Sequence, residues 1–340
     1  MNRRLFLMGL SGLLGCSSAR ERRLNVLNWT DYVAPETIPN FEKEFGVKVN
    51  YQTFESNEEM LAKVMAGNSG WDVVFPTNYM IVPMVESNLL ARLDHTKLAE
   101  LDRLSADFRR PSWDPELSWG VPYMYGGTGI VYNPSVKPAP AAWADLWADR
   151  YGGRLTMLDD PAEVIGACLL KLGLSLNSTD PGELERAKQE AIAQKKFLRA
   201  YLNAEVQDQL VSGDVLTAQL WATTSVLAQQ GNPQLQFIYP SEGFALYCDN
   251  AAILNESKEK ELAHDFLNYL LRPEVSAQIA TTTQTATANG AGLVLMPDNL
   301  RNNTTLFPPP ETIRRGEWFA SLPADAHEAR DRIWTEIKSA

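Results

Sequence analysis

The first 80 residues alternate between short apolar runs and segments with helical spacing, and this order restricts the fold more than any other feature. Residues 24–27 and 71–76 are short apolar runs typical of buried strands, and residues 47–53 alternate in the manner of a strand. Residues 35–45 and 58–66 place apolar side chains three or four positions apart, and a glycine follows each segment. The order strand–helix–strand–helix–strand predicts an open α/β sheet.

The remaining chain continues this mixture without a visible domain boundary. Helices are predicted over residues 161–172, 183–201 and 259–271, and strands over 216–221 and 236–239. A length of 340 residues indicates about two domains. No internal repeat and no low-complexity linker separates them. The two domains must therefore be joined by something other than a conventional linker.

Composition and motifs exclude several classes of function. The formal net charge of −11 argues against nucleic acid or an anionic membrane surface as a partner, because both require positive charge. Three His and three Cys, without CxxC or HExxH spacing, predict no metal site. Nucleotide-binding patterns such as GxGxxG are absent, and no GxSxG occurs after the leader, so we expect no cofactor.

An enzyme is the least favoured class. No Ser/His/Asp or Cys/His arrangement is visible in the sequence. The three histidines, His95, His264 and His327, are scattered through polar segments that we expect to be exposed. The sequence therefore predicts a protein without covalent chemistry.

The N-terminus is typical of an export signal. Arg3 and Arg4 precede an apolar stretch over residues 5–15, which is too short to span a bilayer. The sequence LLGC at residues 13–16 resembles the lipobox of bacterial lipoproteins. This resemblance implies a signal peptide over 1–15, a lipidated tether over 16–23, and attachment to the cell envelope through Cys16 alone. The alternative is an ordinary secretory signal with an incidental cysteine.

Cleavage of the leader would leave two further cysteines and a more acidic chain. Residues 1–15 carry two arginines and no acid, so their removal changes the formal charge from −11 to −13. Cys168 and Cys248 would then lie in an oxidising compartment. Sequence alone cannot set the distance between them, and we expect two separate, buried thiols rather than a disulfide.

Six collinear motifs together resemble one family. They are NWTDYV (28–33), YQTFESNE (51–58), WADLW (143–147), LDDPAEV (158–164), LRPEV (271–275) and ETIRRGEW (311–318). The chain resembles the spermidine/putrescine-binding proteins of bacterial polyamine ABC transporters from about residue 24 to near its C-terminus. The resemblance implies an α/β, two-lobed periplasmic-binding-protein fold of type II, with the lobes joined by hinge crossings near Asn133, Asp249 and Val294. One lobe would be 24–133 plus 250–293, and the other 134–249 plus 294–340.

The family's ligand contacts are carried over position by position. Polyamines need carboxylates for their ammonium groups and aromatic faces for their methylenes, and such faces also attract cations. The resemblance implies a site made of apolar walls, acids and hydroxyl contacts: Trp29, Tyr79, Trp221 and Tyr247; Asp31, Asp160, Glu163 and Asp249; and Thr30, Tyr32 and Thr77. Two positions depart from the family, where Thr285 replaces a tyrosine and Phe319 replaces a polar amide.

A structural role competes with the functional one at several of these positions. Asp160-Pro161-Ala162-Glu163 is also the pattern of a capped helix start, and Asp180-Pro181-Gly182-Glu183 repeats it where the family has no ligand contact. Trp29 and Trp221 could be core residues. Asp249 lies between apolar segments, where an unpaired acid is costly to bury. Asp249 is therefore the strongest candidate for a ligand contact.

The resemblance implies a lipid-anchored, monomeric binding protein that delivers a polyamine to an inner-membrane ABC permease. Two alternatives stay open. The protein could be a sensor subunit that reports polyamine level to a membrane receptor, or it could bind another small cationic solute.

Overall fold

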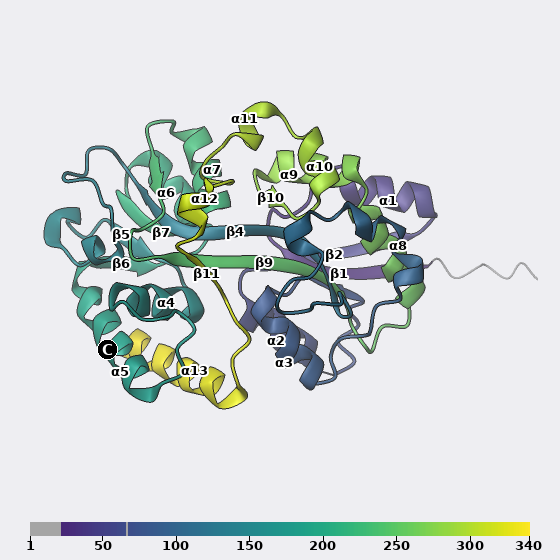
Figure 1. Ribbon diagram of the computed structural model, residues 1–340, viewed down its shortest axis with the longest axis horizontal. Coiled ribbons are helices and arrows are strands. Elements are labelled where there is room, and N and C mark those ends of the chain that lie inside the picture. Colours follow the sequence, from purple (N-terminus) through teal and green to yellow (C-terminus); the bar gives the residue numbers. More distant parts are fainter. Residues whose placement is uncertain (1–21, 66) are drawn as a thin grey trace, which may run out of the picture.

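The computed structural model describes residues 22–65 and 67–340. The expected signal peptide, the lipidation site Cys16 and the tether up to residue 21 lie outside the described residues. Figure 1 shows two lobes side by side, with long strands running between them. No helix in the described part of the chain is both long and apolar enough to cross a membrane.

The N-terminal lobe is built on the predicted strand–helix alternation. Leu24, Val26 and Leu27 of the first strand are fully buried, because parallel strands are covered on both faces by helices. Gly46 ends the first helix in a left-handed conformation. The elements of this lobe are β1 (Arg23–Trp29), α1 (Thr37–Phe45), β2 (Lys48–Phe54), α2 (Asn57–Met65), β3 (Val73–Val74), α3 (Ile81–Glu86), α8 (Lys260–Leu270), α9 (Pro273–Thr283), β10 (Ala286–Thr287) and α10 (Gly290–Leu295).

Two long antiparallel strands connect the lobes. β4 (Gly120–Tyr132) pairs with β9 (Phe244–Ile253) over its first part, with β7 (Thr217–Trp221) from Thr128 onward, and with β8 (Gln236–Ile238) from Ile130 onward. All ten residues of β9 are buried. The short strand β11 (Gly316–Trp318) lies parallel to the start of β9. The sheet therefore continues from one lobe into the other in the order β2-β1-β3-β9-β4-β7-β5-β6, which explains why two lobes occur without a linker.

The second lobe surrounds the other end of this sheet (Figure 1). Its elements are β5 (Leu155–Met157), α4 (Pro161–Lys171), α5 (Pro181–Gln194), β6 (Leu198–Tyr201), α6 (Val206–Ser212), β7 (Thr217–Trp221), α7 (Ala222–Gly231), β8 (Gln236–Ile238) and α13 (Ala324–Ser339). Between α10 and β11 the chain forms two short helices, α11 (Asp298–Arg301) and α12 (Pro310–Ile313).

The prediction of one helix over residues 183–201 is wrong at its C-terminal end. Helix α5 ends at Gln194, and after one 3-10 turn the chain forms strand β6, which pairs in parallel with β5. Pairing with an exposed sheet edge is a tertiary effect, and it overrides local helix preference.

Two expectations about single residues have different outcomes. Cys168 and Cys248 are free and fully buried, as predicted. The expectation that all three histidines are exposed is wrong for His264, which is 5% exposed. Its Nδ1 lies 2.7 Å from the Lys260 carbonyl, and its Nε2 accepts a hydrogen bond from the Asp94 amide at 2.9 Å. His264 therefore ties helix α8 to a neighbouring loop.

Candidate ligand-binding site

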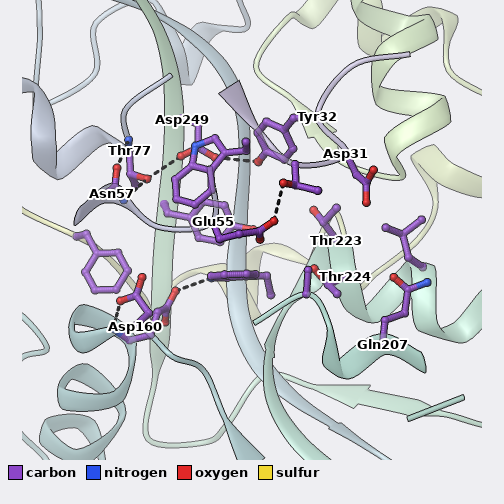
Figure 2. Close-up of a pocket in the computed structure, with 18 of the residues that line it drawn as sticks. Asp31, Tyr32, Glu55, Asn57, Thr77, Asp160, Gln207, Thr223, Thr224 and Asp249 are labelled. Atoms are coloured by element: carbon purple, nitrogen blue, oxygen red, sulfur yellow. Dashed lines mark hydrogen bonds between the residues drawn. The ribbon is translucent and has the colours of Figure 1, made fainter. Parts of the chain in front are cut away.

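A pocket of about 840 Å³, including its open mouth, lies where the strand ends and loops of the two lobes meet. It brings together twelve of the thirteen residues predicted from the sequence: Trp29, Thr30, Asp31, Tyr32, Thr77, Tyr79, Asp160, Glu163, Trp221, Tyr247, Asp249 and Phe319. Figure 2 shows lining side chains converging on the pocket, among them Asp31 and Thr77 from one lobe and Asp160 from the other. Sites at the carboxyl ends of strands are typical of open α/β sheets.

Asp249 occupies the hinge strand β9 and is 3% exposed. Its Oδ1 accepts a hydrogen bond from the Thr77 hydroxyl at 2.7 Å, and its Oδ2 accepts one from the Tyr32 hydroxyl at 2.8 Å. Both donors are neutral, and burial raises the pKa of Asp249 to about 7. Within residues 22–65 and 67–340, no cationic side chain pairs with the buried Asp249 carboxyl, so its charge, when ionised, is uncompensated.

Asp160 has both of the roles weighed from the sequence. Its Oδ1 accepts a hydrogen bond from the Glu163 amide at 3.0 Å, so it caps helix α4. It also lines the pocket and is 6% exposed. Desolvation, followed by the neighbouring Glu163 charge, raises the pKa of the Asp160 carboxyl.

Glu163 does not complete the capping box. Its Oε1 instead accepts hydrogen bonds from the Thr128 hydroxyl at 2.7 Å and from the Trp221 indole Nε1 at 3.0 Å. Burial raises the pKa of the Glu163 carboxyl. The first turn of α4 thus carries two buried acids directed at the pocket.

The aromatic residues form flat walls held by polar contacts. The indole of Trp29 donates to the Phe75 carbonyl at 2.8 Å, and its ring lies 4.5 Å from that of Phe54, measured between centroids. The Tyr79 hydroxyl accepts from the Asn57 side chain at 2.9 Å, and the Tyr79 ring lies edge-on to Phe319 at 5.5 Å. These contacts fix the walls before any ligand is bound.

The mouth of the pocket is polar and solvent-exposed. Asp31 is exposed and adopts a left-handed backbone conformation with φ of 55°, which orients it at the loop after β1. The Thr30 hydroxyl donates to Glu55 Oε1 at 2.6 Å. The Asn203 side chain reaches from the second lobe to the Glu55 carbonyl at 3.4 Å. The two lobes are therefore in contact at the mouth.

Thr285 is the predicted residue that the structure does not bring to the pocket. It is fully buried after helix α9, and its hydroxyl donates to the Thr283 carbonyl at 3.2 Å and accepts from the Thr283 hydroxyl at 3.0 Å. A short side chain at this position is satisfied locally, so it does not extend into the pocket as a tyrosine could.

Seven lining residues were missed by sequence reasoning: Glu55, Asn57, Ala204, Gln207, Thr223, Thr224 and Leu227. Glu55 and Asn57 belong to a motif at the end of β2, and Thr223 and Thr224 follow Trp221 directly. Their positions next to predicted contacts were the available signal. Ala204, Gln207 and Leu227 carry no such signal, because only the tertiary fold brings α6 and α7 to the mouth.

The lining contains five acids and no lysine or arginine. Three of the acids, Asp160, Glu163 and Asp249, are buried among aromatic rings and neutral donors. Within residues 22–65 and 67–340, no group of three or more His, Cys, Asp or Glu side chains is arranged to hold a metal ion. This arrangement suits an organic cation with an apolar chain.

Comparisons with known proteins agree with the predicted resemblance. The family model described as a bacterial extracellular solute-binding protein matches residues 36–291. The chain belongs to this family. It is 36% identical over 332 residues to the spermidine/putrescine-binding periplasmic protein of Escherichia coli strain K12, covering 96% of this chain and 95% of that one.

Other members are similar over nearly the whole chain. The putrescine-binding periplasmic protein SpuD of Pseudomonas aeruginosa is 30% identical over 357 residues, covering 98% of this chain and 97% of its own. A solved structure titled a putative spermidine/putrescine ABC transporter from Listeria monocytogenes has a TM-score of 0.90 at 30% identity, covering 94% of this chain and 99% of that chain. The predicted periplasmic-binding-protein fold is confirmed, and these relatives are transport binding proteins, not enzymes.

Proposed function

We propose that this protein captures a polyamine such as putrescine or spermidine between its two lobes and delivers it to an inner-membrane ABC permease. The observation that carries the proposal is the set of three buried carboxylates, Asp160, Glu163 and Asp249, whose hydrogen-bond donors in the described part of the chain are all neutral. Burying an anion is costly unless a cation accompanies it. An ammonium group at each end of an aliphatic chain supplies that cation, and the walls of Trp29 and Trp221 cover the methylenes.

Similarity supports the same conclusion. Relatives that the chain matches over almost its full length are named for spermidine or putrescine. The twelve pocket residues predicted from the family's ligand-contact positions are the proposed ligand contacts.

Isothermal titration of the purified protein with putrescine, cadaverine, spermidine and spermine tests the binding. We expect saturable binding of at least one of them. An absence of binding to all four would overturn the polyamine assignment and favour another small cation.

Delivery to a permease is tested in cells. Deleting the gene should abolish uptake of labelled polyamine, and restoring it should recover uptake. Uptake that is unchanged, together with a lost transcriptional response to polyamine, would favour a sensor.

We further propose that the protein acts as a monomer in the periplasm, anchored to the membrane by lipid at Cys16. Relatives are named as periplasmic, and one structural neighbour at 26% identity and a TM-score of 0.82 is titled the TpPotD lipoprotein of Treponema pallidum. Labelled palmitate should be incorporated by the full chain and not by Cys16→Ala. Incorporation of palmitate into both proteins, or into neither, would contradict lipid attachment at Cys16.

We also propose the lobe division 24–133 plus 250–293 and 134–249 plus 294–340. The change of partner along β4, from β9 to β7 and β8, supports a crossing just before Asn133. Closure about such crossings is a hinge motion that ligand contacts with both lobes would favour.

A further inference from the structure

Helix α7 begins at the pocket without a cap. It follows strand β7 directly, and no side chain accepts a hydrogen bond from its first turn. The first amide groups of a helix have no intrahelical partner and carry partial positive charge. Thr223 and Thr224, in this first turn, line the pocket (Figure 2).

An unpartnered hydroxyl accompanies these amides. Thr223 is 8% exposed, and its Oγ1 forms no hydrogen bond. The Tyr247 hydroxyl lies nearby, and burial raises its pKa well above the ordinary value, but its position relative to Thr223 Oγ1 does not meet hydrogen-bond geometry. A buried hydroxyl without a partner is destabilising and therefore uncommon. Together with the amides, it points to a group that enters the pocket from outside.

The chemistry of this turn is opposite to that of the acids. Asp160, Glu163 and Asp249 attract an ammonium group, whereas backbone amides can only donate hydrogen bonds and the N-terminal end of a helix disfavours positive charge. A hydroxyl could accept from an ammonium, but the neighbouring amides could not. An oxygen acceptor satisfies both the hydroxyl and the amides.

We propose that the first turn of α7 binds a carbonyl oxygen of the ligand, so that the pocket accepts an aliphatic amine with an ammonium at one end and a carbonyl oxygen at the other. Both mono-N-acylated polyamines and ω-amino acids have this chemistry. The inference rests on the proposed polyamine-type function, because the acids must still bind the ammonium.

Matched ligands test the proposal by isothermal titration: putrescine against N-acetylputrescine, spermidine against N1-acetylspermidine, and 4-aminobutyrate as the carboxylate arm. We expect an acetylated ligand or 4-aminobutyrate to bind less than tenfold more weakly than the matching free polyamine, although it carries one ammonium fewer. If the acetylated ligands bind more tightly than 4-aminobutyrate, the group at the first turn of α7 is an amide carbonyl. If 4-aminobutyrate binds more tightly, that group is a carboxylate.

Two variants at one position separate binding from folding. Thr223→Val removes the hydroxyl at nearly constant shape and should weaken the carbonyl-bearing ligand about tenfold, a larger loss than for putrescine. Thr223→Ser keeps the hydroxyl and should retain the affinity for the carbonyl-bearing ligand. A common loss for all ligands in Thr223→Val would overturn the inference, because the hydroxyl would then serve the fold or the facing lobe.

The result also distinguishes this inference from the proposed function. If free polyamines bind and every carbonyl-bearing ligand binds at least tenfold more weakly, the α7 inference fails and the proposed function stands. If neither group of ligands binds, both fail.

Discussion

Asp249 lies on a strand shared by both lobes, and its two oxygens are already held by Thr77 and Tyr32. Those hydrogen bonds aim the carboxylate but leave its charge uncompensated. Asn57 donates to the Thr77 hydroxyl at 2.9 Å and thus fixes the donor itself. The affinity for a cation should therefore depend more on Asp249 than on the exposed acids Asp31 and Glu55.

Replacing Asp249 with Asn should weaken polyamine binding by on the order of 2–5 kcal/mol, because a buried ammonium would lose its counter-charge. Titration calorimetry with putrescine and spermidine measures the change. Asp265→Asn, at an exposed position on α8, is the matched control and should bind normally. Unchanged affinity in Asp249→Asn would remove this residue from the site.

The same substitution should have the opposite effect on the empty protein. The pKa of Asp249 is raised to about 7 when folded, against about 3.9 for an unfolded chain. The folded state therefore binds more protons between these values, so this group lowers the free energy of unfolding as pH rises from about 4 to 7. We expect Asp249→Asn to melt higher than the unsubstituted protein at pH 8, with a smaller difference at pH 5. A difference independent of pH would show that the carboxyl is not buried in charged form.

Ligand affinity should fall on acidification below about pH 7. An ammonium binds the ionised carboxylates, and burial raises the pKa of Asp160, Glu163 and Asp249. Each proton that must leave can weaken binding by up to about tenfold per pH unit. Calorimetry at pH 6, 7 and 8, in buffers with different protonation enthalpies, should detect both the trend and the released protons. Constant affinity without proton release would contradict the assignment of these acids.

Sequence reasoning placed Asp31, Asp160 and Glu163 at the pocket because they lie in local motifs, and Asp249 because the family position coincides with an acid between apolar segments. It wrongly placed Thr285 in the pocket because the family's ligand-contact position was carried over without regard to side-chain length. The threonine side chain is too short to reach the pocket from its position after α9. It missed Gln207 because α6 meets the mouth through tertiary packing alone.

At the scale of elements, the two similar helix starts have different surroundings. Asp180 caps α5 through the Glu183 amide at 2.9 Å, just as Asp160 caps α4 through Glu163. Asp180 belongs to an exposed surface, and Asp160 belongs to the pocket. One sequence pattern thus supports a purely structural role in one helix and a combined role in the other.

This pair provides an internal control. Asp180→Ala should cost about 0.5–2 kcal/mol of stability and leave ligand affinity unchanged. Asp160→Ala should weaken ligand binding strongly, because it also removes a carboxylate from the pocket. Urea denaturation and calorimetry on both variants measure the two effects. If Asp160→Ala and Asp180→Ala have equal ligand affinity, the role of Asp160 is helix capping alone.

The limits of prediction at this scale lie in sheet pairing. Helices α1, α2, α4 and α8 follow from local periodicity and capping residues. Strand β6 does not, because residues 198–201 become a strand only when β5 offers them an edge. Likewise the order β9-β4 could not follow from local pattern, since the partners are more than 100 residues apart.

At the scale of the whole molecule, ligand contacts come from both lobes and the connections are continuous strands. Asn203 already contacts the Glu55 carbonyl across the mouth. A bound polyamine should add contacts with both sides and favour the closed arrangement. Small-angle X-ray scattering should show a smaller radius of gyration with polyamine than without. The Asp249→Asn variant should show no decrease in radius of gyration at the same ligand concentration. A decrease equal to that of the unsubstituted protein would show that closure does not depend on Asp249.

The two buried, unpaired thiols have a practical consequence. From Arg22 onward the chain has two cysteines, Cys168 and Cys248, and both are fully buried. Thiol reagents act on accessible thiolates, and burial raises the pKa of both groups. A single cysteine placed at the mouth could therefore be labelled selectively with an environment-sensitive dye, which would convert this chain into an optical reporter of its own ligand.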